Sequence, residues 1–411
     1  MRHSIALVTI DAAVLFLMFA LSMPVALAQN GDQVIVPASS IEYPWDIGVR
    51  AHTNILILFD RSALADAPPT AETPASLACI YHLAKQTKGC PQSSTVLPTG
   101  GAKAIALVDA YDNPDAETDI KTFAATYGYG TPNFTKVKVG NPPPDAGWAV
   151  EESLDIEYAF GMAPHAHIYL VEANSNSYSD LFAAEDKATE LLQAEGGGEA
   201  SNSWQGGESS GETSYDSHFK GKDVVYFAAA GDSGGHVGYP SVSPFVVSAG
   251  GTTINRNGSG DFTGESAWSD AGGGPSQFEK RPSYQNIIKK IVGTHRGTPD
   301  FSSDANPNSG VAVQAQYACE NGYEQYCNST YWLIVGGTSV SSPTLAGIVN
   351  AAGAFNTSTS AENTEAYKDY GNAKNYKADW RDITTGSNGY ACKKGWEFCT
   401  GIGSPITYKG K

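Results

Sequence analysis

Apolar segments that end at a carboxylate or a glycine alternate along this chain with segments of helical pattern. Residues 104–111 (AIALVDAY) are almost wholly apolar up to a carboxylate, as buried parallel strands are before a loop. Residues 115–128 (DAETDIKTFAATYG) then have the pattern of a helix closed by glycine. Further strand-like runs lie at 167–173, 223–232 and 245–251, and helix-like runs at 179–198, with Ser179 as cap, and at 338–355. This alternation predicts an α/β fold: a doubly wound, mostly parallel sheet with helices on both faces, in one domain.

The ends of the predicted strands carry the first candidate site residues. In doubly wound sheets, sites gather at the carboxyl ends of the strands. Asp109 and Asp232 each end a predicted strand, and Ser339 opens the predicted helix at 338–355. We therefore expect these three residues to lie at the same edge of the sheet.

The net charge of the chain limits the kinds of partner that it is expected to bind. The chain has 26 Lys and Arg against 43 Asp and Glu, which gives a formal net charge of −17. This excess of negative charge argues against nucleic acid or an anionic membrane surface as a partner. A chain poor in basic residues also gathers less positive charge when its carboxylates protonate, which favours tolerance of acid.

The N-terminus has the pattern of a signal peptide over residues 1–28. A short charged start precedes an apolar run at 12–21 and a cleavage site, Ala-Leu-Ala, at 26–28. Asp11 and Pro24 leave too few uninterrupted apolar residues for a membrane anchor. We expect an exported protein, extracellular or periplasmic, with no membrane partner once the signal is removed.

The six cysteines fall into pairs that are close in sequence. In an exported chain such spacing favours local disulfides, although other pairings are formally possible. A zinc site is not expected, because no C-x-x-C spacing occurs. The predicted disulfides are Cys79–Cys90, Cys319–Cys327 and Cys392–Cys399.

Two serines compete as candidate nucleophiles. Ser233 lies in GDSGG, the surround of the nucleophile in trypsin-like proteases. That chemistry needs an upstream histidine in a distinctive setting and an all-β double barrel. The upstream histidines match no such setting, and the strand before GDSGG belongs to an α/β pattern. Ser233 is therefore not expected to be the nucleophile.

Ser339 lies in G-T-S-x-S-x-P, at the start of a predicted helix. Backbone N–H groups at a helix N-terminus can hold an oxyanion, and Pro343 fits a first turn because its missing N–H costs nothing there. The arrangement resembles the nucleophile segment of the subtilisin-like fold. An ordinary Ser/Thr helix cap is the structural alternative.

A subtilisin also needs a base histidine in an HGT context, which this sequence lacks. Glu151 and Asp155 are four residues apart on a predicted helix and therefore on one face. Two close carboxylates share a proton, so such a pair can take a serine's proton in acid, where a histidine would already be charged. The alternative is a solvated helix face, on which Glu152 and Glu157 are equal candidates.

With these motifs the chain resembles the sedolisin family of serine-carboxyl peptidases, subtilisin-fold enzymes that work in acid. The resemblance runs in order over about residues 72–405 and implies that Ser339 is the nucleophile, Glu151 the general base and Asp155 its supporting acid. The stretches that carry it are TPASLACIY, ALVDAYDNP, EESLDIEYA, SNSWQG, FAAAGDSGG, GGGPSQFEKRPSYQ, RGTPDFSSDANP, GGTSVSSP and DITTG…GWEFCTGIGSP.

The resemblance also gives GDSGG a role, because its aspartate is the family's oxyanion residue. Asp232 would have to be protonated to donate a hydrogen bond to a developing oxyanion, which acid or a pKa-raising pocket permits. A strand-end aspartate that binds turn amides is the alternative. Asp109 matches the carboxylate that continues the hydrogen-bond chain from the base, and Trp204 an aromatic beside it; either could instead be ordinary core or loop structure.

The family binds one calcium ion near its C-terminus, and the resemblance implies a related site here. Oxygen ligands with two carboxylates suit Ca²⁺. Three features count against it: Glu397 replaces an aspartate, Lys393 brings a cation close, and a disulfide could brace the loop instead. The predicted ligands are Asp382, the carbonyl of Ile383, the carbonyls of Lys393 and Gly395, and Glu397.

The segment at 29–71 is a second departure from the family, whose members usually carry a long propeptide that blocks the site and is removed by self-cleavage. At this length the segment is too short for an independent folded domain. We expect a peptidase domain over 72–411, a monomer acting on peptide or protein substrates. The rival hypothesis is a secreted binding or structural protein that keeps the fold without turnover.

Overall fold

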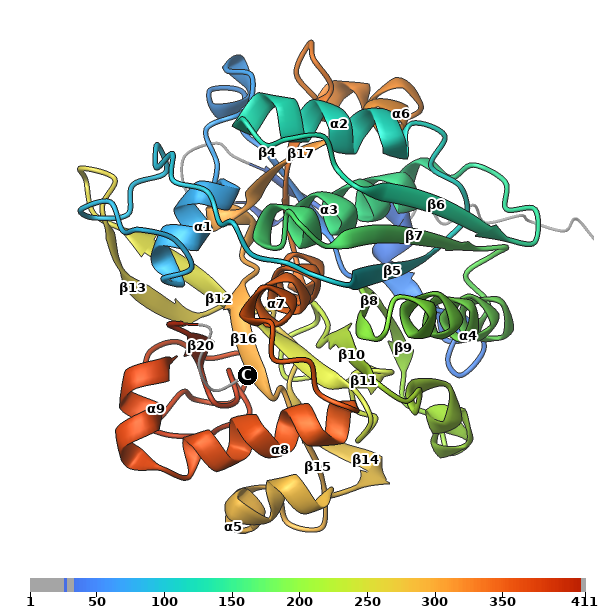
Figure 1. Ribbon diagram of the computed structural model, residues 1–411, viewed down its shortest axis with the longest axis vertical. Coiled ribbons are helices and arrows are strands. Elements are labelled where there is room, and N and C mark those ends of the chain that lie inside the picture. The colour runs from blue at the N-terminus through green and yellow to red at the C-terminus, as the bar shows by residue number, and fades with distance from the viewer. Residues whose placement is uncertain (1–25, 28–32, 408–411) are drawn as a thin grey trace, which may run out of the picture.

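The computed structural model describes residues 26–27 and 33–407 (Figure 1). The predicted signal peptide lies outside the described residues, apart from Ala26–Leu27, which form β1. Within the described part, no helix is long and apolar enough to cross a membrane.

The central sheet is mostly parallel, as predicted. Its order is β13-β12-β10-β8-β5-β7-β6, β16 also pairs with β12, and among these neighbours the β12–β13 pairing is antiparallel. The strands are β5 (Ala104–Ala110), β6 (Phe134–Val139), β7 (His167–Ala173), β8 (Gly198–Asn202), β10 (Val224–Ala229), β12 (Val247–Arg256), β13 (Phe262–Ala267) and β16 (Phe301–Asp304).

Helices cover both faces of this sheet, because successive side chains of a strand point to opposite faces. On β5, Ile105 and Leu107 join the core beneath α3 and α7, whereas Ala106 and Val108 join the core beneath α4. The helices are α1 (Pro74–Ile80), α2 (Ala116–Tyr127), α3 (Ala146–Met162), α4 (Tyr178–Ala194), α5 (Lys289–Val292), α6 (Gln316–Glu320), α7 (Thr338–Ala352), α8 (Thr359–Tyr370) and α9 (Ala373–Asp379).

Smaller sheets surround the central one. A second sheet has the order β1-β2-β4-β18-β17, a third the order β11-β9-β3, and two strand pairs complete the set. These strands are β2 (Gln33–Ile35), β3 (His52–Thr53), β4 (Leu56–Phe59), β9 (Trp204–Gly207), β11 (Gly238–Tyr239), β14 (Gly274–Lys280), β15 (His295–Thr298), β17 (Val311–Gln314), β18 (Trp332–Gly336), β19 (Trp380–Arg381) and β20 (Ser404–Pro405). Strands β2, β3 and β4 come from the N-terminal segment. Strand β3 pairs with β9 and β4 pairs with β18, both later in the chain, whereas β2 pairs with β4.

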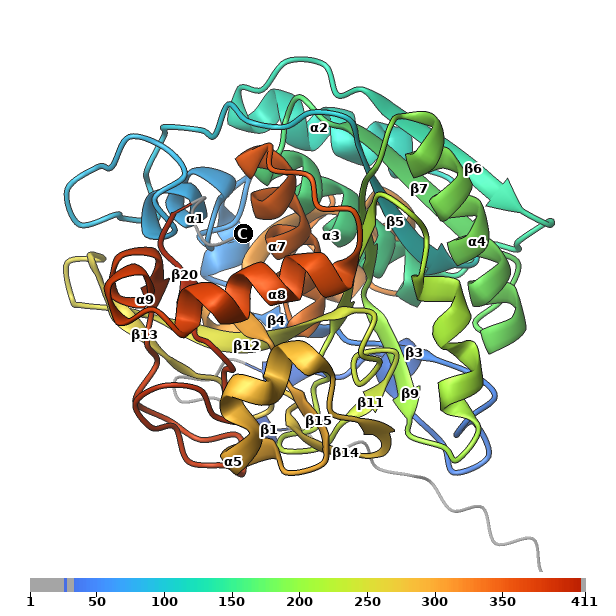
Figure 2. The ribbon, with the colours of Figure 1, turned by 60° about the horizontal axis from the view of Figure 1, so that its bottom comes forward.

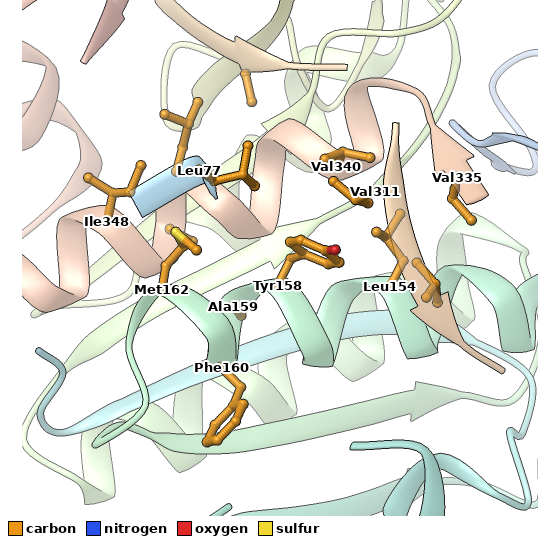
Figure 3. Close-up of a cluster of buried hydrophobic side chains, with 14 of the residues drawn as sticks. Leu77, Leu154, Tyr158, Ala159, Phe160, Met162, Val311, Val335, Val340 and Ile348 are labelled. Atoms are coloured by element: carbon orange, nitrogen blue, oxygen red, sulfur yellow. The ribbon is translucent and has the colours of Figure 1, made fainter. Parts of the chain in front are cut away.

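The packing of α3 against α7 positions the candidate site. Apolar side chains of the two helices, among them Leu154, Tyr158 and Val340, meet in one buried cluster (Figure 3). Gly347 of α7 allows the close approach, because an added Cβ would lie 2.7 Å from the Cβ of Met162. The two helices that carry Ser339 and the paired carboxylates are thereby held side by side (Figure 1).

Two local predictions were wrong. Pro343 lies in the interior of α7, which begins at Thr338, and not in its first turn. The fourth helix begins at Tyr178, and its cap is Ser177, not Ser179. Ser177 has extended backbone geometry, which directs its hydroxyl to accept a hydrogen bond from the amide of Asp180 at 3.2 Å.

The three predicted disulfides, Cys79–Cys90, Cys319–Cys327 and Cys392–Cys399, are all present. Each joins cysteines separated by 7 to 11 residues. They therefore brace local turns and do not link distant parts of the fold.

Candidate active site

Ser339 lies in the first turn of α7 and is fully buried. Its amide donates a hydrogen bond to the carbonyl oxygen of Asn54 at 3.2 Å, and its hydroxyl donates to the carbonyl oxygen of Ser203 at 3.0 Å. The hydroxyl also interacts with the carboxyl of Glu151; burial raises the pKa of that carboxyl, and this contact offsets part of the rise. The candidate nucleophile and the candidate base are thus neighbours, although they are far apart in sequence.

Glu151 and Asp155 lie on α3, which is buried on all sides between α2, α7 and the sheet. The alternative interpretation, a solvated helix face, is wrong, because both carboxyls and those of Glu152 and Glu157 are inaccessible to solvent. Asp145 caps the helix by accepting hydrogen bonds from the amides of its first turn.

Burial raises the pKa of Glu151 and of Asp155 well above the usual range, since charge is costly without solvent. The nearby carboxyl of Asp109 raises both further, and Glu151 raises that of Asp155. The hydroxyl of Ser203 donates a hydrogen bond to Asp155 at 2.8 Å. The pair therefore holds protons that isolated carboxyls would have lost, as proton sharing requires.

Asp232 follows β10 and faces the start of α7. One carboxyl oxygen accepts hydrogen bonds from the amide and the hydroxyl of Thr338, both at 2.8 Å. The other oxygen, Oδ2, is buried and has no hydrogen-bond partner among the described residues. Burial raises the pKa of Asp232 to about 8. At neutral and acid pH, Asp232 is therefore protonated, and Oδ2 can donate this proton in a hydrogen bond.

Gly337 precedes Thr338 and Ser339 at the start of α7 and lies close to Asp232, where there is no room for a side chain. Its φ of 113° disfavours any other residue, and an added Cβ would lie 2.6 Å from Asp232 Oδ2 and 2.0 Å from the carbonyl oxygen of Asn54. The free carboxyl oxygen of Asp232 and the carbonyl oxygen of Asn54 therefore both lie close to Gly337, next to the amide of Ser339. A protonated Asp232 and this amide are donors of the kind that can stabilise an oxyanion.

The two predicted supporting residues lie beside the site in different ways. Burial and the charge of Glu172 raise the pKa of Asp109 to about 8, and neither of its oxygens has a hydrogen-bond partner among the described residues. Asp109 is therefore protonated at neutral and acid pH, and the hydrogen-bond chain that was expected from the base does not form among the described residues. The indole of Trp204 donates to the carbonyl oxygen of Val108 at 2.9 Å and so holds the strand end next to Asp109.

Sequence reasoning missed Asn54, Ser203 and Thr338. Ser203 and Thr338 adjoin residues that were nominated, in SNSWQ and GTS, and this adjacency was the available signal. Asn54 lies in the mixed N-terminal segment, where no motif marks it. Ser233, the serine of GDSGG, is exposed, whereas its neighbour Asp232 reaches α7.

The predicted calcium ligands do not form a site that fits the ion. Both carboxyl oxygens of Asp382 accept from the amide of Gly395, at 3.0 and 3.2 Å, whereas the prediction required the carbonyl of Gly395. The oxygens of Glu397 accept from the amides of Cys399 and Thr400 and from the Thr400 hydroxyl. Ile383 is buried and Lys393 is exposed, and the Cys392–Cys399 disulfide closes the same turn. Donors within the turn satisfy its carboxylates, so no catalytic step is derived through calcium.

Chelation of divalent cations is therefore expected to leave the melting temperature of the protein unchanged. An ion bound to the folded state would stabilise it in proportion to its occupancy, and the chelator would remove that stabilisation. Thermal melts with a chelator, with added Ca²⁺ and with neither would measure this. A fall of several degrees with the chelator, reversed by Ca²⁺, would establish the calcium site instead.

Comparisons with known proteins identify relatives of this chain. No family model matches the chain. The chain is 28% identical over 386 residues to kumamolisin of Bacillus sp. (strain MN-32), covering 83% of this chain and 63% of that protein. It is 25% identical over 414 residues to xanthomonalisin of Xanthomonas sp. (strain T-22), covering 83% and 46%. It thus spans less than two thirds of the length of these two relatives.

A third relative, sedolisin of Pseudomonas sp. (strain 101), is 20% identical over 432 residues, with 91% of this chain and 69% of that protein covered. Among solved structures, Pseudomonas sedolisin (serine-carboxyl proteinase) complexed with two molecules of pseudo-iodotyrostatin superposes with a TM-score of 0.68 at 20% identity. That match covers 83% of this chain and 96% of the other. Sphericase has a TM-score of 0.52 at 17% identity. These likenesses support the predicted subtilisin-like fold and the resemblance to the sedolisins.

Proposed function

We propose that this chain, a relative of the sedolisin family, is an exported serine-carboxyl endopeptidase that hydrolyses peptide bonds in acid. The observation that carries the proposal is that Glu151 and Asp232 both lie at the first turn of α7, Glu151 beside Ser339 and Asp232 bound to Thr338. The similarity to sedolisin-type relatives supports a serine-type peptidase, and the peptide or protein substrate class follows from it. Export and a monomeric state are part of the same proposal.

The catalytic steps follow from the roles that the geometry suggests. The hydroxyl of Ser339 turns from the Ser203 carbonyl, passes its proton to Glu151 and attacks the substrate carbonyl carbon. The Ser339 amide and the protonated Oδ2 of Asp232 stabilise the oxyanion. Glu151 then protonates the leaving amine, and water releases the acyl group by the reverse route. Asp155 shares a proton with Glu151 and so sets the pH at which the base is available.

The pH range follows from these groups. The Glu151–Asp155 pair acts while it shares one proton, so its second deprotonation ends activity as pH rises. Asp232, with a pKa of about 8, loses its donor proton in the same direction. Activity is therefore expected between the first and the second deprotonation of the pair. It falls in strong acid, where both carboxyls keep their protons and no base is available, and it is lost towards alkaline pH.

The test is hydrolysis of a denatured protein by the chain from Gln29, measured from strongly acid to neutral pH. A peptide aldehyde, which adds to an activated serine, should inhibit it, whereas the corresponding alcohol should not. Negligible hydrolysis at every pH, from protein shown to be folded, would overturn the peptidase proposal. The catalytically silent binding protein would then be the better hypothesis.

Substitution of Asp232 separates its hydrogen bond from its titration. Asp232→Asn keeps a neutral donor at every pH, so it is expected to retain most activity in acid and to lose less as pH rises. Asp232→Ala removes the donor and is expected to lower kcat about 10²- to 10³-fold. A shift of the kcat profile of Asp232→Asn to higher pH would support this role of Asp232. An equal loss of kcat in Asp232→Asn and Asp232→Ala would contradict it.

The buried carboxyls also predict stability in acid. Burial raises the pKa of Glu199 to about 8, and its carboxyl accepts a hydrogen bond from the side chain of Asn350 at 2.7 Å. Because the folded pKa exceeds the unfolded one, the stabilisation is full in acid and is lost as pH rises towards 8. Between pH 4.5 and pH 7, this group alone is expected to lower the free energy of unfolding by about 3 kcal/mol.

Glu199→Gln is therefore expected to flatten the pH dependence of urea unfolding by about 3 kcal/mol over this range. Glu190→Gln, at an exposed position on α4, is the matched control and should leave the dependence unchanged. Parallel pH curves for the wild type and Glu199→Gln would show that Glu199 is not neutral in the folded protein.

A further inference from the structure

Two neighbouring strands of the central sheet lead into the candidate active site. Strands β8 and β10 pair in parallel, so their carboxyl ends lie at the same edge of the sheet. After β8 the chain reaches Ser203, whose carbonyl oxygen accepts a hydrogen bond from the Ser339 hydroxyl at 3.0 Å. After β10 it reaches Asp232, the proposed donor to the oxyanion. In the proposed mechanism, the substrate residue that Ser339 attacks therefore lies between chain segments 203–205 and 230–232.

The side chain of Gln205, the second residue of β9, brings these two segments into contact. An added Cβ on Gly231 would lie 2.5 Å from Nε2 and 2.6 Å from Oε1 of Gln205. An added Cβ on Gly238 would lie 2.8 Å from the same Oε1. Gly238 belongs to β11, which pairs antiparallel with β9 and lies beside it (Figure 2). The amide group of Gln205 thus lies between β9, β11 and the residue before Asp232, and it fits because neither glycine has a side chain.

The oxygen of this amide group has no partner in the protein. Gln205 is 8% exposed, and its Oε1 is buried without a hydrogen-bond partner among the described residues. The side chains of its two neighbours are both bonded, Ser203 to the carboxyl of Asp155 and Trp204 to the carbonyl oxygen of Val108. A buried acceptor without a donor is costly, and such groups are usually paired in folded proteins. A donor supplied by the substrate would remove this cost.

The rest of β9 offers no competing side chain at this place. Trp204 lies in the core beneath α4, because successive side chains of a strand point to opposite faces. Gly206 and Gly207 have no side chain. Any selection by this strand among substrate side chains therefore depends on Gln205, and substitutions at this one position test it.

We propose that Gln205 selects the substrate residue whose carbonyl group Ser339 attacks, in favour of a short side chain with a hydrogen-bond donor, as in serine, threonine or asparagine. This inference rests on the proposed function and names the substrate preference of the same site. Shortness follows from the contacts of Gln205, whose side chain fills the space beside Gly231 that a large substrate side chain would need. The donor follows from Oε1, which a hydroxyl or an amide N–H of the substrate would pair.

Gln205→Leu tests the hydrogen bond, because leucine has nearly the same size but no polar atom. The assay is hydrolysis in acid of peptides that are identical except for serine, alanine or phenylalanine before the scissile bond. Wild-type kcat/KM is expected to be at least about 10-fold higher for serine than for alanine, since alanine leaves Oε1 unpaired. In Gln205→Leu this ratio should fall to about 1, and the alanine peptide should be hydrolysed as by the wild type.

Gln205→Gly tests the size limit, because it opens the space beside Gly231. The variant is expected to raise kcat/KM for phenylalanine relative to serine by at least about 10-fold over the wild type. Gln193→Leu, at an exposed position on α4, is the matched control and should leave every ratio unchanged. Masses of the products identify the bond that is cut, and the cut sites in a denatured protein give a second measure of the same preference.

The outcomes separate this inference from the proposed function. A wild-type ratio of serine to alanine near 1, or a ratio that Gln205→Leu leaves unchanged, would overturn the inference, while hydrolysis of the denatured protein would leave the proposed function standing. If Gln205→Leu does not fold, the wild-type ratio and the Gln205→Gly series decide in the same way. No hydrolysis of any peptide or of the denatured protein, by folded wild type, would overturn the proposed function and this inference with it.

Discussion

Replacing Ser339 by alanine is expected to lower the hydrolysis of a denatured protein in acid by at least about 10⁴-fold. The substitution removes the only atom that the mechanism allows to form the acyl-enzyme, while Asp232 and the backbone amide remain. It also removes one hydrogen bond, to the Ser203 carbonyl, so the loss of stability should be about 1 kcal/mol. Turnover at the acid optimum and thermal unfolding of both proteins would measure the two effects.

Ser342→Ala is the matched control, because Ser342 is buried on the same helix and its hydroxyl bonds Ser201 at 2.8 Å. It loses one hydrogen bond of the same kind but no part of the proposed machinery. Turnover close to wild type is expected. A similar loss in both variants would indicate damage to α7, and wild-type turnover in Ser339→Ala would exclude Ser339 as the nucleophile.

Glu151→Gln is expected to lower kcat about 10²- to 10⁴-fold, because glutamine has nearly the same shape but cannot take the serine's proton. Glutamine keeps the size of glutamate and can accept the same hydrogen bond from the Asn54 amide, so the fold should be kept. At neutral pH the variant should be more stable than the wild type, since burial raises the pKa of Glu151 and ionisation opposes folding there. Single-turnover rates and urea unfolding at two pH values would measure both.

Glu157→Gln controls for this substitution. Glu157 is equally buried on α3, but its carboxyl accepts from the amide of Gln314, away from Ser339. The control should gain stability at neutral pH for the same reason and keep its turnover. If Glu151→Gln kept its turnover within about tenfold, the base would have to be another group.

The structure changed how two of the sequence patterns are interpreted. From their spacing, the four carboxyls of α3 could be assigned to a helix. The sequence could not show whether they are buried or solvated, because α3 is enclosed on all sides and its polar residues do not mark a solvated face. The C-terminal turn kept the carboxylates of the predicted calcium site, yet its own amides satisfy Asp382 and Glu397. The spacing of residues in the sequence shows which of them are close along the chain, but not which hydrogen-bond donors contact their carboxyls in the folded protein.

The sequence by itself determined the alternation of strands and helices, the three local disulfides and the nomination of Ser339, Glu151, Asp155 and Asp232, because these depend on periodicity or on short motifs. The tertiary structure alone decided that these residues meet and that Asn54 lies among them. Asn54 binds Glu151, Ser203 and Ser339 through its backbone amide and carbonyl, and Ser203 accepts through its backbone carbonyl, groups that any side chain could accompany. Backbone contacts of this kind leave no mark on residue type, and so only the folded chain reveals them.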